Sequence, residues 1–422
     1  MRSNMITVVT AIASMLLVAQ VAAADAVQDQ LQLMEQRMAE MEDRLQATSD
    51  ELQTAKATVN QQRSVLSTNG LIEDEGLRSG VGSFLDSVDI SGVAAASYNH
   101  RLIESDINDD LVGGNNLFKN PDADTFSVDQ IWMTIDKAPT EDSRAGFHVE
   151  YFSGKSAQAQ NGGADDTVGL YSAYVSYLAP IGNGVQLDAG RLATPLGAEV
   201  VQTDGNFNIT QGALFGLQPV THTGAQISTA LTDTIGFTFG IVNNVYGNDM
   251  TSNDADKAYY GQLQIDLGAA NLNAGFITGE DNCAGGEADC ETTVIDVVLS
   301  ASPTESLDVW ANFDYQIIDD EAGADGDSWG LSFAGRQALS DTTGVSARVE
   351  YVVRESGLSD LGANTDDTEL LTITGTLDRA LTDSLTARVE LRYDELIEDG
   401  GVAFATTEED QLVGIAQLVY SF

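Results

Sequence analysis

Residues 385–394 read LTARVELRYD, and polarity changes at every step along this stretch. The two alternating sets are Leu385, Ala387, Val389, Leu391 and Tyr393, and Thr386, Arg388, Glu390, Arg392 and Asp394. A period of two puts these sets on opposite faces of a β-strand, whereas a helix would scatter the charges around its circumference. Residues 345–354, VSARVEYVVR, repeat the pattern with Arg348, Glu350 and Arg354 on the polar side.

The same alternation recurs as far as Phe422, behind an apolar leader. A soluble β-sandwich also alternates, but export and recurrence together favour a membrane β-barrel. In such a barrel apolar side chains face lipid and charged side chains face a watery interior. We therefore predict an all-β fold, a transmembrane antiparallel barrel of about sixteen strands over residues 88–422.

The composition narrows the possible functions. The formal net charge of -46 argues against nucleic-acid binding, which depends on Lys and Arg neutralising phosphates. An acidic excess suits a solvated secreted surface, a high-salt habitat or a channel that favours cations. No apolar run of 18 or more residues follows the N-terminal leader, so the sequence predicts no membrane-spanning helix in the mature chain.

The first 87 residues are predicted to form three parts that precede the barrel. Residues 1–24 have the basic start, apolar run and small-residue cleavage site of a signal peptide, with a membrane anchor as the alternative. Residues 25–68 follow alternating steps of three and four, as in a coiled coil, and residues 69–87 form a glycine-containing linker. The seam that would drive self-association contains Leu31, Met38, Leu45, Leu52, Val59 and Leu66. A helix lying along another periplasmic surface is the competing interpretation.

Connections between the expected strands alternate between tight turns and long stretches rich in Asp, Asn and Gly. This asymmetry is typical of short periplasmic turns and long external loops. An even strand count would put both ends of the barrel on the periplasmic side, where the coiled coil is expected. The last strand is amphipathic and ends in Phe422, which resembles the signal read by the outer-membrane assembly machinery.

Three stretches carry a resemblance to a known family: residues 174–201 (YVSYLAPIGNGVQLDAGRLATPLGAEVV), 213–228 (ALFGLQPVTHTGAQIS) and 236–249 (GFTFGIVNNVYGND). They resemble the OmpL-like β-barrel porin family. The resemblance implies a Gram-negative outer-membrane channel, in contact with lipid and lipopolysaccharide, that passes small hydrophilic solutes or ions without a cofactor. It also favours a homotrimer over a dimer, since large porins are commonly trimeric.

Alternation along the strands nominates side chains that face the lumen. A charge on the lipid face costs about 2–4 kcal/mol near the midplane, which forces these groups inward. The alternative is that the Arg and Glu side chains only neutralise one another across strands. The predicted pore-lining residues are Arg348, Glu350, Arg354, Arg388, Glu390, Arg392, Asp394, Asp308 and Asp314.

Residues 194–218, which follow the fifth expected strand, are too apolar for a freely solvated loop. By resemblance to general porins, we expect this stretch to fold into the barrel and narrow it. Glu199 and Asp204 would then face the arginines of the thirteenth and fifteenth strands, and opposed charges can build selectivity. A loop packed over the barrel mouth or on a neighbouring subunit is the alternative.

The remaining candidates for chemistry are few. Cys283 and Cys290, the two cysteines of the sequence, are expected to form a disulfide within one external loop of the exported chain. No His lies near them, so a metal site is not expected, and the three His of the chain are scattered. Arg191 interrupts an apolar face, which predicts either a position near the outer rim or a bulge near Gly190.

These observations favour a porin. The alternative is a structural or adhesive barrel whose lumen is plugged. A barrel lipase would need a His–Ser pair, which is not evident in the sequence.

Overall fold

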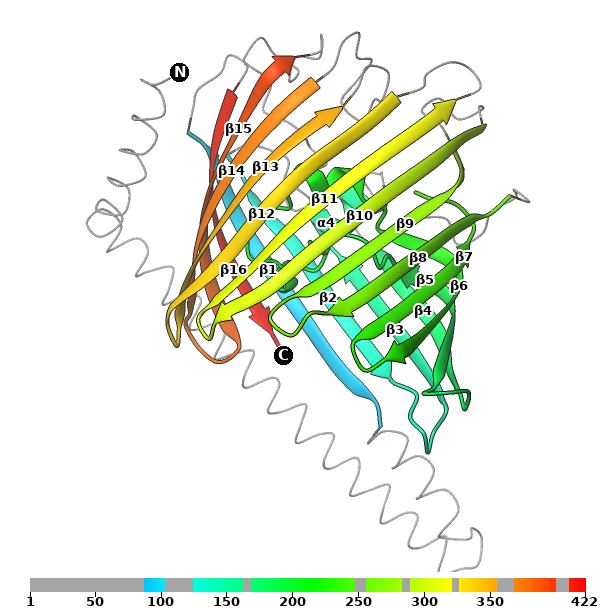
Figure 1. Cartoon of the computed structure of the whole chain (residues 1–422). Coiled ribbons are helices and arrows are strands. Elements are labelled where there is room, and N and C mark those ends of the chain that lie inside the picture. Colours follow the sequence, from blue (N-terminus) through cyan, green and yellow to red (C-terminus); the bar gives the residue numbers. More distant parts are fainter. Residues whose placement is uncertain are drawn as a thin grey trace, which may run out of the picture. The chain divides into compact units, whose positions relative to one another are not determined.

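The computed structural model describes residues 87–102, 124–161, 168–246, 256–282, 289–320, 326–354, 368–399 and 410–422. The predicted signal peptide, coiled coil and linker, up to residue 86, lie outside the described residues, as does Cys283. The described residues form sixteen strands and three short helices (Figure 1).

The strands are β1 (Asp89–Arg101), β2 (Phe126–Lys137), β3 (Ala145–Ser153), β4 (Val168–Ala179), β5 (Val185–Ala193), β6 (Thr221–Thr232), β7 (Ile235–Val242), β8 (Ala258–Asp266), β9 (Asn271–Asn282), β10 (Asp289–Thr304), β11 (Leu307–Asp320), β12 (Gly326–Ser340), β13 (Thr343–Arg354), β14 (Thr368–Ala380), β15 (Leu385–Asp399) and β16 (Asp410–Ser421). The helices are α4 (Lys155–Asn161), η1 (Thr203–Gly205) and η2 (Leu214–Leu217).

Each strand pairs antiparallel with its neighbours in sequence, and β1 pairs with β16, so the sheet closes on itself. At this seam Gly92 and Phe422 exchange two backbone hydrogen bonds of 3.1 Å. Closure leaves no unpaired edge, which is the requirement for a sheet surrounded by hydrocarbon. The prediction of a sixteen-stranded antiparallel barrel is confirmed.

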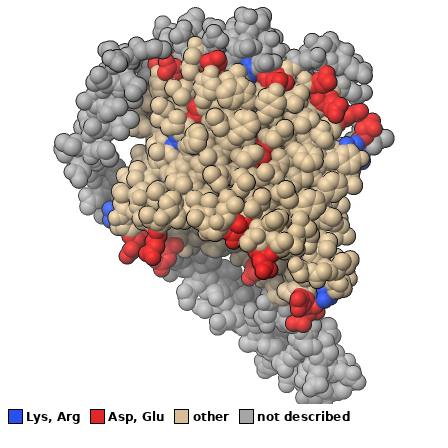
Figure 2. All heavy atoms as spheres, viewed as in Figure 1, with Lys and Arg blue, Asp and Glu red and all other residues tan. Residues whose placement is uncertain are grey.

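The two faces of the sheet differ as the alternation predicts. On β13, Val345 and Val349 are 40% and 44% exposed on the outer face, whereas Arg348 and Glu350 are 0% and 1% exposed inside. On the side visible in Figure 2, most of the barrel wall carries neither basic nor acidic residues, and acidic residues gather towards its two ends. The outer wall therefore suits a lipid environment.

The interior is less uniformly polar than the sequence pattern predicts. Trp132, Phe152 and Tyr171 point inward and pack on one another, with ring centroids 4.6–5.8 Å apart. Irregular pairing at Ala95/Ala96 between β1 and β2, and at Glu150/Tyr151 between β3 and β4, interrupts the alternation near these rings. A β-bulge adds one residue and re-aims the side chains beyond it, so a strict period of two cannot predict them.

Short turns join the strands at one end of the barrel. The turn between β4 and β5, for example, uses Gly182 and Gly184 at φ 58° and 98°, a backbone region that favours glycine. At the other end α4 packs against β2, β3 and β4, and its Ala157 is fully buried. None of the helices in the described ranges is long and apolar enough to cross a membrane.

Candidate functional site

Residues 194–218, here called the inner segment, connect β5 to β6 and lie inside the barrel. Their contacts reach inward-facing side chains on widely separated strands. Gln130 of β2 binds the Val201 carbonyl and the Thr203 amide, both at 3.0 Å. On β11, Asn312 accepts a 3.0 Å hydrogen bond from the Ala198 amide. The inner segment therefore spans the lumen between these parts of the wall.

Apolar side chains fix the inner segment at several points of the wall. Val201 and Phe215 join the cluster around Trp132, and Leu196 packs with Tyr260 and its neighbours on β7–β10. Elsewhere the segment completes two smaller clusters, in which Leu214 and Leu217 pack with Val352 and Leu370, and Ile209 packs with Val413 and Ile415. Because these side chains are buried, removing them from water stabilises the inward position.

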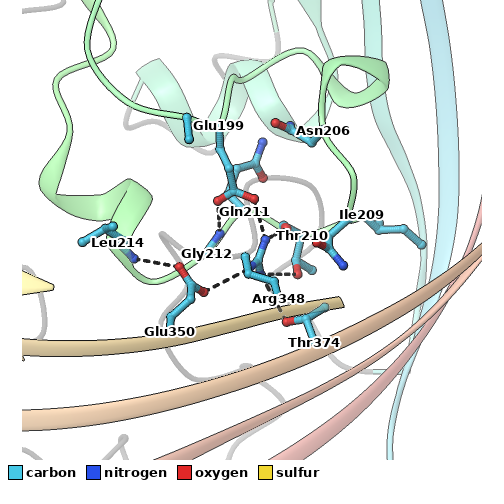
Figure 3. A network of polar contacts seen from close by, with 12 residues as sticks. Glu199, Asn206, Ile209, Thr210, Gln211, Gly212, Leu214, Arg348, Glu350 and Thr374 are labelled. Carbon is cyan, nitrogen blue, oxygen red and sulfur yellow. Dashed lines mark hydrogen bonds and ion pairs between the residues drawn. The ribbon is translucent and has the colours of Figure 1, made fainter. Parts of the chain in front are cut away.

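Arg348 is the centre of a buried polar network (Figure 3). Its guanidinium forms ion pairs with Glu199 of the inner segment at 2.5 Å and with Glu350 of its own strand at 3.0 Å. It also donates to the Thr210 carbonyl at 2.6 Å and to the Thr374 hydroxyl at 3.2 Å. One fully buried arginine thus joins two points of the inner segment, Glu199 and Thr210, to β13 and β14.

The carboxylates of the wall bind backbone amides of the inner segment. Glu350 accepts from the Ala213 and Leu214 amides at 3.1 and 3.4 Å. Glu390 of β15 accepts from the Ile209 and Thr210 amides at 2.5 and 3.1 Å. Such charge-assisted hydrogen bonds are stronger than neutral ones. The geometry leaves little room at Gly212, where an added Cβ would overlap the Glu350 carboxylate.

The arginines of β15 bind backbone carbonyl oxygens of the inner segment. Arg388 donates to the carbonyls of Thr203 at 3.0 Å and Asn206 at 2.5 Å. Arg392 donates to the Gln211 carbonyl at 2.7 Å. The wall therefore holds the main chain of the segment through hydrogen-bond donors on β15 and acceptors on β13 and β15.

Glu199 itself is covered by its neighbours. Its second carboxylate oxygen accepts a 2.6 Å hydrogen bond from the Gly212 amide, within the same segment. Burial raises the pKa of Glu199 above that of an ordinary glutamate, although the Arg348 guanidinium opposes the rise and the Glu350 carboxylate adds to it. Glu199 therefore holds the inner segment to the wall, and the Arg348 guanidinium stabilises its negative charge.

Within the described structure, Asp204 hydrogen-bonds to polar side chains rather than to an arginine. It accepts hydrogen bonds from Ser421 at 3.0 Å and from Gln202 at 2.9 Å, while Arg388 binds backbone carbonyls instead. The Asp204 charge nevertheless acts on Arg388, so the expected opposition of these two groups stays a prediction, without a direct ion pair among the described residues. On β15, Asp394 binds Arg392 at 2.9 Å and receives a hydrogen bond from Gln411.

The other nominated residues are spread over the barrel. Asp314 is fully buried beneath the inner segment and accepts from Gln218 at 3.1 Å. Asp308 lies near the end with short turns, where Ser302 donates to it at 2.6 Å, and the half-buried Arg354 ends β13 at the opposite end. Cys290 is disulfide-bonded, whereas its predicted partner Cys283 lies outside the described residues.

Six of the nominated charges are thus brought together beneath the inner segment, and none of the six is more than 8% exposed: Arg348, Glu350, Arg388, Glu390, Arg392 and Asp394. The prediction that they line open water is corrected in this respect. The inner segment covers them, so their direct contacts are with protein. Arg191 is also buried, at 6% exposed, and donates to Thr221 at 3.0 Å; Gly190 before it has φ 145°.

A second polar group, which sequence reasoning did not nominate, lies on β2–β4. His148 contacts Asp136 at 2.7 Å and Glu150 at 3.4 Å, and its ring stacks on Tyr174 at 4.9 Å. The side chains of Asp136, His148 and Glu150 are 34%, 17% and 14% exposed, so water reaches this group. Alternation along residues 145–153 could have found His148 and Glu150, which share the inward face.

Comparisons with known proteins agree with this architecture. A family model described as "Putative beta-barrel porin-2, OmpL-like" matches residues 87–422. No curated protein matches the chain. Within the described residues there is no cluster of three or more His, Cys, Asp or Glu that could hold a metal ion.

Solved structures share the fold at low sequence identity. An anion-selective porin from Comamonas acidovorans is 13% identical, with 80% of this chain and 99% of that chain covered and a TM-score of 0.56. A trimer form of OmpT from Vibrio cholerae is 12% identical, with coverages of 79% and 99% and a TM-score of 0.54. The outer membrane channel DcaP of Acinetobacter baumannii is 10% identical, with coverages of 79% and 97% and a TM-score of 0.52.

Proposed function

The chain belongs to the OmpL-like β-barrel porin family and is an outer-membrane porin channel, and from this premise we propose that the inner segment is its constriction. Small hydrophilic solutes or ions would cross passively, without a covalent step, between this segment and the part of the wall it leaves uncovered. The observation that carries the proposal is the Arg348–Glu199 ion pair, because it joins the segment to the wall opposite its own strands.

The charges that water can reach favour cations in this proposal. Arg348 is engaged by the inner segment, and Arg336 pairs with Asp378 at 2.7 Å. By contrast, the two carboxylates Asp136 and Glu150 share one partner, His148, which can carry at most one positive charge, so at least one negative charge of this group is not compensated by it. A passage lined by uncompensated carboxylates raises the local concentration of cations. The formal charge of the whole chain points the same way but does not set the charge of the passage.

A reversal-potential measurement tests this preference. The purified mature protein, inserted in a planar bilayer under a KCl gradient, should show a potential of the sign given by K⁺ permeation. Asp136→Asn combined with Glu150→Gln should reduce it, whereas Glu141→Gln in the turn after β2 should leave it unchanged. Anion preference in the wild type would contradict the proposal.

A plugged lumen is the second candidate, and one observation favours it. The inner segment contacts the wall on both sides of its origin, through Val201 near β2 and Leu196 near β8–β10. Conductance of the wild type separates the two candidates. If the wild type is silent in bilayers while a variant with residues 195–217 replaced by a short glycine linker conducts, the segment is a plug and the constriction proposal fails.

We also propose a homotrimer whose coiled coil, residues 25–68, lies in the periplasm. The heptad seam of the sequence supports self-association, and the solved OmpT structure is described as a trimer form. Lipid and lipopolysaccharide would contact the outer wall. Light scattering in detergent should give three chains for the mature protein. Leu45→Asp with Leu52→Asp on the seam should weaken assembly, whereas Glu51→Asp off the seam should not, and a monomeric wild type would refute the proposal.

A further inference from the structure

Two carboxyl groups face each other beneath the inner segment without a basic partner in the described structure. Asp296 of β10 and Asp314 of β11 are directly paired across the strands, and both side chains are 0% exposed. The same amide nitrogen, Asn312 Nδ2, lies within hydrogen-bond distance of both carboxyl groups, so their oxygens lie close together. Two ionised carboxylates this close in a buried site repel, and neither has a hydrogen to donate, so one shared proton would replace the repulsion by a hydrogen bond.

The other partners of the pair are neutral amides. Asn312 Nδ2 donates to Asp296 at 2.8 Å and to Asp314 at 3.2 Å, and Gln218 Nε2 donates to Asp314 at 3.1 Å. Asp296 Oδ1 has no hydrogen-bond partner within the described structure. Amide donors stabilise one negative charge well, whereas two adjacent charges in a buried site repel strongly.

The surrounding elements add no counter-charge to this site. The inward residue of β9 opposite Asp296 is Gly275, and that of β12 opposite Asp314 is Gly330. Leu196 and Leu214 of the inner segment cover these glycines so closely that a Cβ on either would overlap a leucine methyl group. The leucines close the space beside the carboxyl pair.

The titratable and charged groups further out are already engaged. Tyr260 on β8 donates to Gln226, and Glu350 on β13 is bound by Arg348 and by two amides of the inner segment. Neither supplies a positive charge to Asp296 or Asp314. The site is therefore acidic and buried, and one shared proton reduces its two negative charges to the single charge that the amide donors can stabilise.

We propose that Asp296 and Asp314 share one proton at neutral pH and that this protonated pair latches both ends of the inner segment to the wall. The Ala198 amide at the start of the segment bonds to Asn312 beside the pair, and Gln218 at the end of the segment bonds to Asp314 and to Asn312. At alkaline pH hydroxide removes the shared proton, the two carboxylates repel, water enters and both ends of the segment loosen. Loosening would widen the channel; that last step rests on the proposed constriction, whereas the shared proton does not.

The sign of the pH effect follows from proton counting. At neutral pH ordinary aspartates of an unfolded chain are ionised, since their pKa is about 3.9. The folded pair retains a proton that the unfolded chain has lost, so raising the pH favours the state without it. The latch is therefore strongest under acidic to neutral conditions and fails in alkali.

Infrared spectroscopy of the full mature protein in lipid tests the shared proton directly. The wild type at neutral pH should show the C=O stretch of a protonated carboxyl group, and Asp314→Asn should lose it. This variant keeps one negative charge and the amide hydrogen bonds, so it mimics the protonated pair permanently. Asp188→Asn is the matched control, because Asp188 is a buried lumen carboxylate that accepts only from Ser176, Gln186 and Gln226 in the described structure.

Hydrogen–deuterium exchange of peptides covering 194–200 and 212–218 tests the latch. After correction for intrinsic exchange, protection should be lost at alkaline pH in the wild type and in Asp188→Asn but not in Asp314→Asn. Absence of the protonated-carboxyl band overturns the shared proton. If the protonated-carboxyl band is present but the wild type keeps its amide protection at alkaline pH, the latch is overturned. The latch is also overturned if Asp314→Asn loses as much protection as the wild type. Both experiments test the shared proton and the latch even if the wild-type protein does not conduct ions.

Discussion

Removing the Arg348 guanidinium should release the inner segment from the wall. In Arg348→Gln, Glu199 and Glu350 remain buried beside each other, at 8% and 1% exposed, without the cation that bridges them. Breaking a buried ion pair by removing one partner costs about 3–5 kcal/mol. Other anchors survive, among them the bonds of Glu390 to the segment, so we place the effect at the lower end, about 3 kcal/mol.

The cost should appear as local opening of the inner segment rather than unfolding of the barrel. Every 1.4 kcal/mol is tenfold, so about 3 kcal/mol raises the population of the open segment about a hundredfold. Hydrogen–deuterium exchange of the Gly212, Ala213 and Leu214 amides reports this population, because all three donate to Glu199 or Glu350.

A double variant separates the charge from the packing. Glu199→Gln combined with Arg348→Gln removes one of the two uncompensated carboxylates, so protection should recover in part relative to Arg348→Gln alone. Arg354→Gln, at the half-buried end of the same strand, is the control for losing an arginine from β13. Unchanged amide exchange in Arg348→Gln would refute the idea that this network holds the segment.

Three further predictions concern the barrel and its constriction. Gly190→Ala should destabilise the fold by about 1–3 kcal/mol in urea unfolding from lipid, because φ 145° is strained for alanine, whereas Gly375→Ala, with open space around it, should not. Val349→Arg should cost about 2–4 kcal/mol in the same assay and Leu381→Arg, in a turn, about 0–1 kcal/mol; equal costs would contradict the membrane orientation. Replacing residues 195–217 by a short glycine linker should raise single-channel conductance, and an unchanged conductance would show that the inner segment does not limit flow.

The strands could be predicted because the alternation of lipid-facing and inward-facing side chains is visible in each stretch of sequence by itself. Every second side chain on β13 and β15 meets lipid, and short turns rich in polar residues join consecutive strands. A period of two therefore survives in the sequence wherever one face is apolar and the other is not. The same reasoning correctly put Arg348, Glu350 and Glu390 inside.

What these inward groups contact was not predictable from alternation. Glu199 and Arg348 are 149 residues apart, and the inner segment that joins them has no periodic pattern. Because β-bulges shift the faces, Trp132 looked like any other residue of an alternating strand, although it forms the largest apolar anchor of the segment. The expectation that alternate residues meet water inside fails where the inner segment covers the wall.

The barrel wall binds the inner segment through backbone atoms, which are common to all residue types. Arg388 and Arg392 bind peptide oxygens, and Glu350 and Glu390 bind peptide hydrogens. These backbone contacts do not depend on which side chains the bound residues carry. Side chains of the inner segment that face the passage are thus free to vary over evolutionary time, or to be replaced by those of another channel. The backbone of the segment keeps its position on the wall.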